Sequence, residues 1–208
     1  MDYDRADFAR ELDVMPEVLE HFDAWRELLL KWNRRINLVS PRAVEAFWHR
    51  HALDSWQLAA HVPDGVRSAI DLGSGAGFPG LAIAVALKLR GEGRVLLVEA
   101  AGKKANFLRT VARELDLPAD VTSERAEDLA ECEADLVTAR AFAPLPKLLA
   151  YSAPFWGADT VGLFPKGAGL RDEVDAAQQD WSFALSVLPS RTDADAGILR
   201  VEGLEHNH

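Results

Sequence analysis

The chain has 208 residues, 49% of them hydrophobic, and a formal net charge of −10. This length is typical of one domain, or of one domain with a small extension, and it allows a sizeable core. The single cysteine, Cys132, excludes an internal disulfide and a cysteine-cluster metal site. No apolar run is long enough to span a membrane, and the acidic N-terminus lacks a secretory signal. We therefore expect a cytoplasmic protein without a metal. Its acidic balance argues against nucleic-acid binding unless cations cluster locally.

Residues 1–62 predict a helical extension that packs on the rest of the chain. Helices are predicted over 4–12 and 16–35, the second with Pro16 in its first turn, where proline is tolerated. An apolar stripe recurs at helical spacing in the second helix, and we interpret it as core rather than as a partner-binding face. Its members are Phe22, Trp25, Leu28, Leu29 and Trp32.

A third helix is predicted over residues 44–60, and it carries several polar residues. His51 and Asp54 are three positions apart and therefore share one helical face. Two side chains are too few for a structural metal site. A surface or capping role and a contact with a cofactor or RNA both remain open for this pair.

From residue 68 the pattern changes to short apolar runs that alternate with helical segments. This alternation predicts an α/β fold with a mostly parallel sheet and helices on both faces. The last two strands have no long helix between them, so we expect them to pair antiparallel. Seven strands with this ending are typical of the Rossmann-like class I methyltransferase fold. Strands are predicted at 68–72, 94–98, 119–123, 134–138, 160–164, 183–188 and 197–202, and helices at 80–90, 103–115, 145–152 and 169–180, with one turn at 126–130. We assign residues 63–203 to this domain and interpret 204–208 as a remnant of an expression tag.

The first strand runs into a glycine-rich turn, Gly73-Ser-Gly-Ala-Gly-Phe-Pro-Gly80, followed by a helix. Gly75, Gly77 and Gly80 satisfy the weak G-x-G-x-x-G pattern of dinucleotide sites. However, the carboxylate of Asp71 would repel a pyrophosphate and suits an ammonium group. S-adenosylmethionine carries an ammonium and a sulfonium and has no phosphate. Asp71, Gly73, Gly75 and Gly77 therefore favour S-adenosylmethionine over a nicotinamide or flavin cofactor, or over a turn without a ligand.

Ligands of such sheets bind at the carboxyl ends of the strands. Glu99 follows the second strand, where an acidic residue commonly accepts hydrogen bonds from ribose hydroxyls. Ala126 and Glu127 follow the third and offer an apolar wall and a polar partner for adenine. Arg140 and Lys166 follow the fourth and fifth and place two cations at the mouth of the site. Arginine cannot act as a general base, but it can bind a carboxylate, a phosphate or guanine O6.

No nucleophile set of the Ser/His/Asp or Cys/His kind follows these strands. Methylation of a ring nitrogen with a lone pair, such as guanine N7, requires no deprotonation. Such a reaction depends on positioning the ring against the sulfonium methyl. The strand-end residues are compatible with this chemistry, with Arg140 orienting the base.

Read together, several segments resemble the RsmG (GidB) family of bacterial small-subunit rRNA methyltransferases. They are Asn37-Leu38, Arg50-His51-x-x-Asp54-Ser55, Asp71 to Gly80, Lys103-Lys104, Phe107-Leu108, Arg125-Ala-Glu127, Arg140-Ala-Phe-Ala143 and Lys166-Gly167. The resemblance implies methyl transfer from S-adenosylmethionine to N7 of a guanosine in the 530 loop of 16S rRNA. It also implies cofactor contacts by Gly73, Phe78, Ala126, Glu127 and Arg140. The chain departs from the family at Glu99, commonly aspartate, and at Pro165, often leucine.

The implied partner is 16S rRNA or the small ribosomal subunit, and we expect a monomer. We predict a basic face that follows the phosphate backbone, made of Arg34, Arg35, Arg42, Arg50, Lys103, Lys104, Arg140, Lys147 and Lys166. The alternatives are a methyltransferase for another RNA, a protein or a small molecule, an NAD-dependent oxidoreductase, and a protein that binds S-adenosylmethionine without catalysis.

Overall fold

The computed structural model describes residues 3–207, and it begins with two helices as expected, α1 (Arg5–Glu11) and α2 (Pro16–Asn33). The Asp4 carboxylate caps α1 by accepting hydrogen bonds from the backbone N–H groups of Ala6 and Asp7. In return, the Asp7 carboxylate accepts from the backbone N–H of Asp4. This reciprocal capping satisfies donors that a helix N-terminus otherwise leaves unpaired.

The single helix expected over 44–60 is wrong, because this segment is broken into four short pieces. They are α3 (Pro41–Glu45), the π-helical turn η1 (Trp48–Leu53), α4 (Asp54–Trp56) and the 3₁₀ turn η2 (Gln57–His61). Over six residues, side-chain periodicity hardly distinguishes i→i+5 from i→i+4 hydrogen bonding, so the π-helical turn could not be predicted from sequence. Such turns occur frequently at functional sites.

The predicted seven-stranded sheet is confirmed, with strand order β3-β2-β1-β4-β5-β7-β6. The first five strands are parallel, and β7 runs antiparallel between β5 and β6. The strands are β1 (Ser68–Leu72), β2 (Arg94–Val98), β3 (Ala119–Thr122), β4 (Ala134–Ala139), β5 (Trp156–Lys166), β6 (Trp181–Pro189) and β7 (Gly197–His206).

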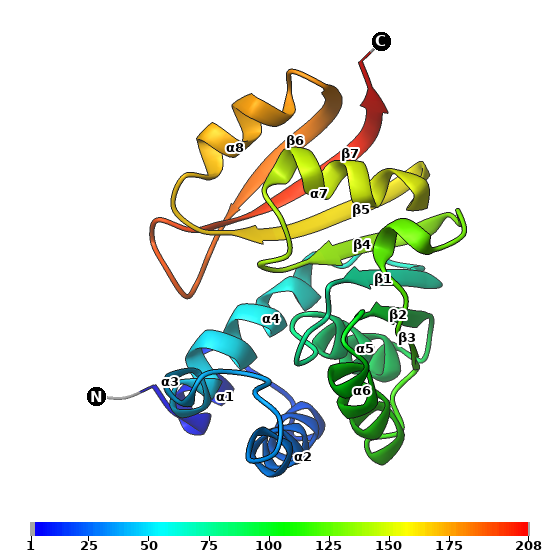
Figure 1. Cartoon of the computed structure of the whole chain (residues 1–208). Helices are drawn as coiled ribbons and strands as arrows, with labels where there is room; N and C mark the ends of the chain where they lie inside the picture. The colour runs from blue at the N-terminus through cyan, green and yellow to red at the C-terminus, as the bar shows by residue number, and fades with distance from the viewer. Residues whose placement is uncertain (1–2, 208) are drawn as a thin grey trace.

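Helices cover both faces of this sheet, as Figure 1 shows. One face carries α5 (Gly80–Arg90), α6 (Gly102–Glu114) and the N-terminal helices, and the other carries α7 (Leu145–Ser152) and α8 (Leu170–Ala177). Short 3₁₀ turns, η3 (Ala126–Asp128) and η4 (Ala153–Phe155), complete the fold. Successive strand residues alternate between the two cores, so Leu136 joins the first and Val137 the second.

The apolar stripe of α2 packs as core, as expected. Phe22, Trp25 and Leu29 are at most 1% exposed and belong to the same cluster as Leu81 of α5. At the other end of the chain, β7 continues through His206, which pairs with Trp181 of β6. The fold therefore extends past residue 203, where we placed the end of the domain. Within residues 3–207, no helix is both long and apolar enough to cross a membrane.

Candidate cofactor and substrate site

The glycine turn between β1 and α5 adopts a backbone that requires glycine. Gly73, Gly75 and Gly77 have φ values of 68°, 58° and 97°, a region that residues with a Cβ rarely adopt. A Cβ on Gly73 would lie 2.3 Å from the ring of Phe142. At Gly75, by contrast, the nearest atom to such a Cβ is the Gly73 carbonyl oxygen, at 3.8 Å. The turn therefore leaves space beside Gly75 that a ligand could approach, which fits a cofactor held against the backbone.

Asp71 lies beneath this turn rather than facing it. Its side chain is 0% exposed, and its Oδ1 accepts a hydrogen bond of 2.7 Å from the Thr138 hydroxyl. Burial raises the pKa of Asp71 to about 6. We expected Asp71 to hold a cofactor ammonium directly or through water. The buried placement does not match a direct contact, and a contact through water stays a prediction. Asp71 instead joins β1 to β4 and lies against Gly80, the first residue of α5.

Glu99 connects the turn to the end of β2. Its Oε2 accepts from the backbone N–H of Gly75 at 2.9 Å, and its Oε1 accepts from Ala101 at 2.8 Å. Both carboxylate oxygens thus hold backbone at the mouth of the site. Glu99 therefore lies beside the glycine turn, and its contact with ribose hydroxyls stays a prediction.

After β3, the 3₁₀ turn η3 places the two predicted adenine contacts in different surroundings. Ala126 is buried and packs in the second core, as an apolar wall would. Glu127 is exposed, with its nearest cation, Arg125, at 3.9 Å. Their contacts with adenine stay predictions.

Phe78, at the end of the turn, lies between two other rings. It stacks on Trp25 at 4.3 Å between ring centroids and on His51 at 4.4 Å. The guanidinium of Arg140 lies 5.1 Å from the centre of the Phe78 ring, a cation–π contact. The helical extension therefore contributes directly to the wall of the glycine turn.

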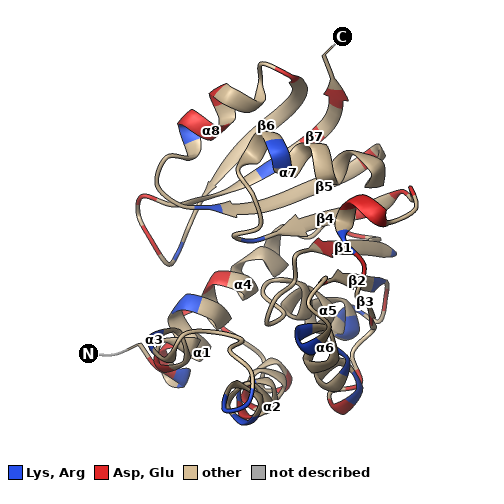
Figure 2. Ribbon diagram, viewed as in Figure 1, with Lys and Arg blue, Asp and Glu red and all other residues tan. Residues whose placement is uncertain are grey.

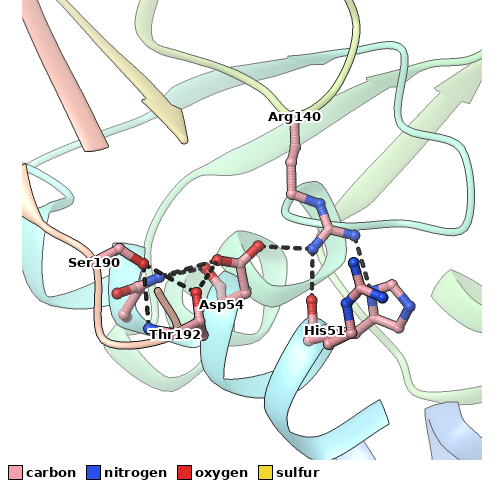
Figure 3. A network of polar contacts seen from close by, with 7 residues as sticks. His51, Asp54, Arg140, Ser190 and Thr192 are labelled. Atoms are coloured by element: carbon pink, nitrogen blue, oxygen red, sulfur yellow. Dashed lines mark hydrogen bonds and ion pairs between the residues drawn. The ribbon is translucent and has the colours of Figure 1, made fainter. Parts of the chain in front are cut away.

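Arg140 follows β4 and points to the face that carries the helical extension. The reason is the strand alternation, since Leu136 and Thr138 precede it on that face. Its Nη1 donates to Asp54 Oδ2 at 2.8 Å and to the Arg50 carbonyl at 3.0 Å, and its Nη2 donates to His51 Nδ1 at 3.0 Å (Figure 3). The Arg140 side chain is 19% exposed. Arg140 therefore lies at the end of β4 with all three of its hydrogen-bond acceptors on the extension, and its contact with a substrate or cofactor stays a prediction.

His51 is neutral in the folded protein. Burial, together with the charges of Arg140 and Arg50, lowers the pKa of His51 to about 3, compared with about 6.5 in an unfolded chain. Between these values only the unfolded chain takes up the proton. The contribution of neutral His51 to the free energy of unfolding is therefore fully present above pH 6.5. It is lost as the pH falls towards 3.

We accordingly expect His51→Asn to weaken the acid sensitivity of the fold. Between pH 7 and pH 5 the wild type should lose about 2 kcal/mol of unfolding free energy through this residue, and the variant should not. Urea unfolding of both proteins at the two pH values measures the difference. Burial raises the pKa of Asp71, so this residue changes the free energy of unfolding with pH in the opposite direction. Because both proteins contain Asp71, its effect cancels when they are compared. An equal loss of unfolding free energy in the two proteins would contradict the lowered pKa of His51.

Lys166 was predicted as a second cation of the site, and its placement does not match this. Its Nζ donates to Glu173 Oε2 at 2.7 Å and to the Ala143 carbonyl at 2.8 Å, and its side chain is only 11% exposed. Glu173 also accepts from the backbone N–H of Leu145. The ion pair therefore joins β5 to the starts of α7 and α8. Pro165 does not interrupt β5, which pairs with β7 through Lys166.

Part of the predicted basic face lines a groove between α2 and α6. Its volume is about 590 Å³, and both helices carry lysines and arginines in Figure 2. In the described part of the chain, three of its cations, Lys31, Arg35 and Lys103, form no ion pair. The other lining residues are Leu28, Trp32, Ile36, Asn106, Thr110, Arg113 and Glu114. Arg140 and Lys166 do not join this surface, because both are ion-paired elsewhere.

Sequence reasoning missed two features of the site. It did not connect Asp54 to Arg140, and it did not include the β6–β7 connection, from which Thr192 donates to Asp54. The only sign of the contact between Asp54 and Arg140 was the i, i+3 spacing of His51 and Asp54, which places both side chains on one helical face. Among residues 3–207, no group of three or more metal-ligating side chains is present.

Solved structures of similar fold include methyltransferases. The mitomycin 7-O-methyltransferase MmcR aligns over 97% of this chain and 73% of its own, with a TM-score of 0.61 and 13% identity. A TehB-like S-adenosylmethionine-dependent methyltransferase from Corynebacterium glutamicum aligns over 86% and 98%, with a TM-score of 0.57 and 16% identity. These likenesses confirm the class I methyltransferase fold.

Sequence similarity is much closer to one group of enzymes. Proteins named ribosomal RNA small subunit methyltransferase G are 45% identical in Hyphomonas neptunium, over 94% of this chain and 93% of the relative, and 44% identical in Parvibaculum lavamentivorans, over 97% and 90%. The GidB family model, described as rRNA small subunit methyltransferase G, matches residues 18–194. This result overturns the oxidoreductase alternative. The chain belongs to the rRNA small subunit methyltransferase G family, and its cofactor is S-adenosylmethionine.

Proposed function

We propose that the protein methylates N7 of a guanosine in the 530 loop of 16S rRNA. The observation that supports this most directly is the placement of Arg140 at the end of β4, against Phe78 and beside the glycine turn. A guanidinium there can donate to guanine O6, which orients the ring without occupying its N7. We further propose that the enzyme acts as a cytoplasmic monomer.

The proposed reaction needs positioning rather than a base. When bound, S-adenosylmethionine supplies an electrophilic methyl group on its sulfonium. The N7 lone pair could accept this methyl group without loss of a proton, so no residue of the chain would have to act as a base. The residues of the chain hold the two reactants in line, which contributes to rate by orientation. Glu99 and the glycine turn would hold the cofactor, and Arg140 the base.

The cationic groove between α2 and α6 fits a path for RNA phosphates. It begins at Lys103, in the first turn of α6, four residues after Glu99 in the chain. A track of cations that leads away from the site is expected to hold the backbone that flanks a target nucleotide.

We expect the double charge reversal Arg35→Glu and Lys103→Glu to weaken rRNA binding about tenfold or more. It should also reduce the slope of log affinity against log salt by about 1.5 to 2, since two phosphate contacts are lost. Filter binding at several salt concentrations measures both quantities. Arg171→Glu, an exposed reversal on α8 across the sheet, is the control. An equal loss in the control would indicate an effect of net charge alone.

The proposed function is tested by mapping the methyl group. Methyl-labelled S-adenosylmethionine is incubated with the protein and small subunits, or 16S rRNA, that lack N7-methylguanosine in the 530 loop. Label at one guanosine there, detected by strand cleavage at N7-methylguanine, is the expected result. Label at another position would support a different rRNA target. Bound cofactor without any rRNA label would favour another RNA, a protein or a small molecule as substrate.

A further inference from the structure

One carboxylate joins the site to the far end of the chain. Asp54 Oδ2 accepts a hydrogen bond of 2.8 Å from Arg140 Nη1, and Asp54 Oδ1 accepts one of 3.0 Å from the Thr192 hydroxyl. Figure 3 shows Arg140 reaching Asp54 from one side, while the connection that carries Ser190 and Thr192 approaches from the other. The Asp54 side chain is only 18% exposed. Charge-assisted hydrogen bonds in such surroundings are stronger and more directional than exposed ones.

The β6–β7 connection is itself held in place around Asp54. The Ser190 and Thr192 hydroxyl oxygens lie 2.9 Å apart, and the backbone N–H of Thr192 donates to Ser190. Gln57 donates to Asp54 Oδ1 at 3.2 Å and accepts from the backbone N–H of Arg191 at 2.9 Å. Two independent bridges thus fix this connection to the same carboxylate.

The orientation of Arg140 follows from its acceptors. An arginine has five N–H donors in a rigid plane. Three of them are used by Asp54, the Arg50 carbonyl and His51. Within residues 3–207, the Nε–H and one Nη2–H are left without a partner, and together they suit a carboxylate or a carbonyl oxygen. Because Asp54 is the only anion among the three acceptors, it contributes most to holding the plane.

We propose that Asp54 is a positioning residue for methyl transfer, which orients the Arg140 guanidinium toward substrate or cofactor, and that Thr192 in turn orients Asp54. The inference rests on the proposed role of Arg140 at the site. The proposal predicts that the β6–β7 connection affects the rate of methyl transfer through Thr192, although none of the predicted site residues lies in this connection.

The test compares Asp54→Asn, Thr192→Val and the control Asp135→Asn. Asp135 is also a carboxylate that accepts hydrogen bonds, from the backbone of Arg67 and Ser68, but it lies at the start of β4, at the opposite end of this strand from Arg140. We expect Asp54→Asn to lower kcat for total label transferred to rRNA about 10- to 100-fold and Thr192→Val to lower it severalfold. The control should keep wild-type kcat. Melting temperatures are measured for all three variants.

A double-mutant cycle separates positioning from a structural role. In an Arg140→Ala background, Asp54→Asn should change the rate less than twofold, because the group it orients is gone. Wild-type kcat in Asp54→Asn, or a full additional loss in the Arg140→Ala background, would overturn the proposal. If Asp54→Asn does not fold, Thr192→Val decides, since it removes only the hydroxyl that reaches Oδ1, and wild-type kcat in this variant overturns the proposal.

This test remains separate from that of the proposed function. Total label counts methyl groups at any rRNA position, so label at an unexpected base contradicts the 530-loop target and leaves the comparison of rates intact. If the wild-type protein labels no rRNA, the same variants are compared by their S-adenosylmethionine dissociation constants. Asp54→Asn must then change the affinity in the same direction as Arg140→Ala, and unchanged affinity overturns the proposal.

Discussion

Replacement of Arg140 by alanine is expected to lower methyl transfer by at least about 100-fold, the range seen when a positioned charged donor is removed. Among residues 3–207, the Arg140 guanidinium is the one strand-end cation in a cation–π contact with Phe78 of the glycine turn. Its loss also leaves the Asp54 carboxylate without its cation, so we expect a destabilisation of about 1–3 kcal/mol in addition. The fold should remain intact. Initial rates at saturating rRNA and cofactor, with thermal unfolding of the same samples, measure the two effects separately.

Arg140→Lys is the matched control for this result. Lysine keeps the charge but lacks the planar fork that reaches Asp54, the Arg50 carbonyl and His51 together. We expect an intermediate rate, above that of alanine and below that of arginine. If Arg140→Ala retained the wild-type rate, Arg140 would have no part in the mechanism.

Gly75→Val is expected to abolish cofactor binding. The backbone of Gly75 has a φ of 58°, which a β-branched residue resists. Since a Cβ at Gly75 would meet no atom closer than 3.8 Å, the valine side chain would enter the space beside the turn rather than collide with the protein. That is the space in which we expect the ligand to lie. Calorimetric titration with S-adenosylmethionine measures the loss.

The backbone strain of this substitution needs its own control. Gly91 ends α5 with a φ of 70°, and a Cβ there would also meet nothing within 4 Å. Gly91→Val therefore carries a similar strain at the opposite end of the same helix. We expect it to lower stability and to leave the affinity for the cofactor unchanged. Equal affinity in wild type and Gly75→Val would mean that the glycine turn does not hold the cofactor.

The layout of the sheet could be predicted because it depends on local patterns. Short apolar runs alternate with helical segments, and the absence of a helix between the last two strands predicts their antiparallel pairing. The place of Arg140 could be predicted for the same reason, since it directly follows a buried strand. Which residue follows a strand can be read from the local sequence. Because the first five strands are parallel, their carboxyl ends lie at the same end of the sheet.

The partners of these residues could not be predicted, because they depend on how distant segments pack. Asp54, which pairs with Arg140, lies 86 positions earlier in the chain. It directly follows a π-helical turn, which has no clear sequence pattern. Lys166 was expected to face the site, but the chain turns at Gly169, with a φ of 89°, and brings Glu173 of α8 to it. Asp71 was expected to face a ligand, because the sequence does not show that Thr138 lies beside it on the neighbouring strand.

The three stacked rings of Trp25, Phe78 and His51 have a consequence for the modularity of this enzyme. They come from α2, the glycine turn and η1, so the middle ring of the stack belongs to the core and both outer rings belong to the extension. A core separated from residues 1–62 would leave the Phe78 ring without both of its stacked aromatic partners, and only the Arg140 guanidinium would remain beside it. Residues 1–62 therefore complete the packing around the glycine turn as well as extending the fold.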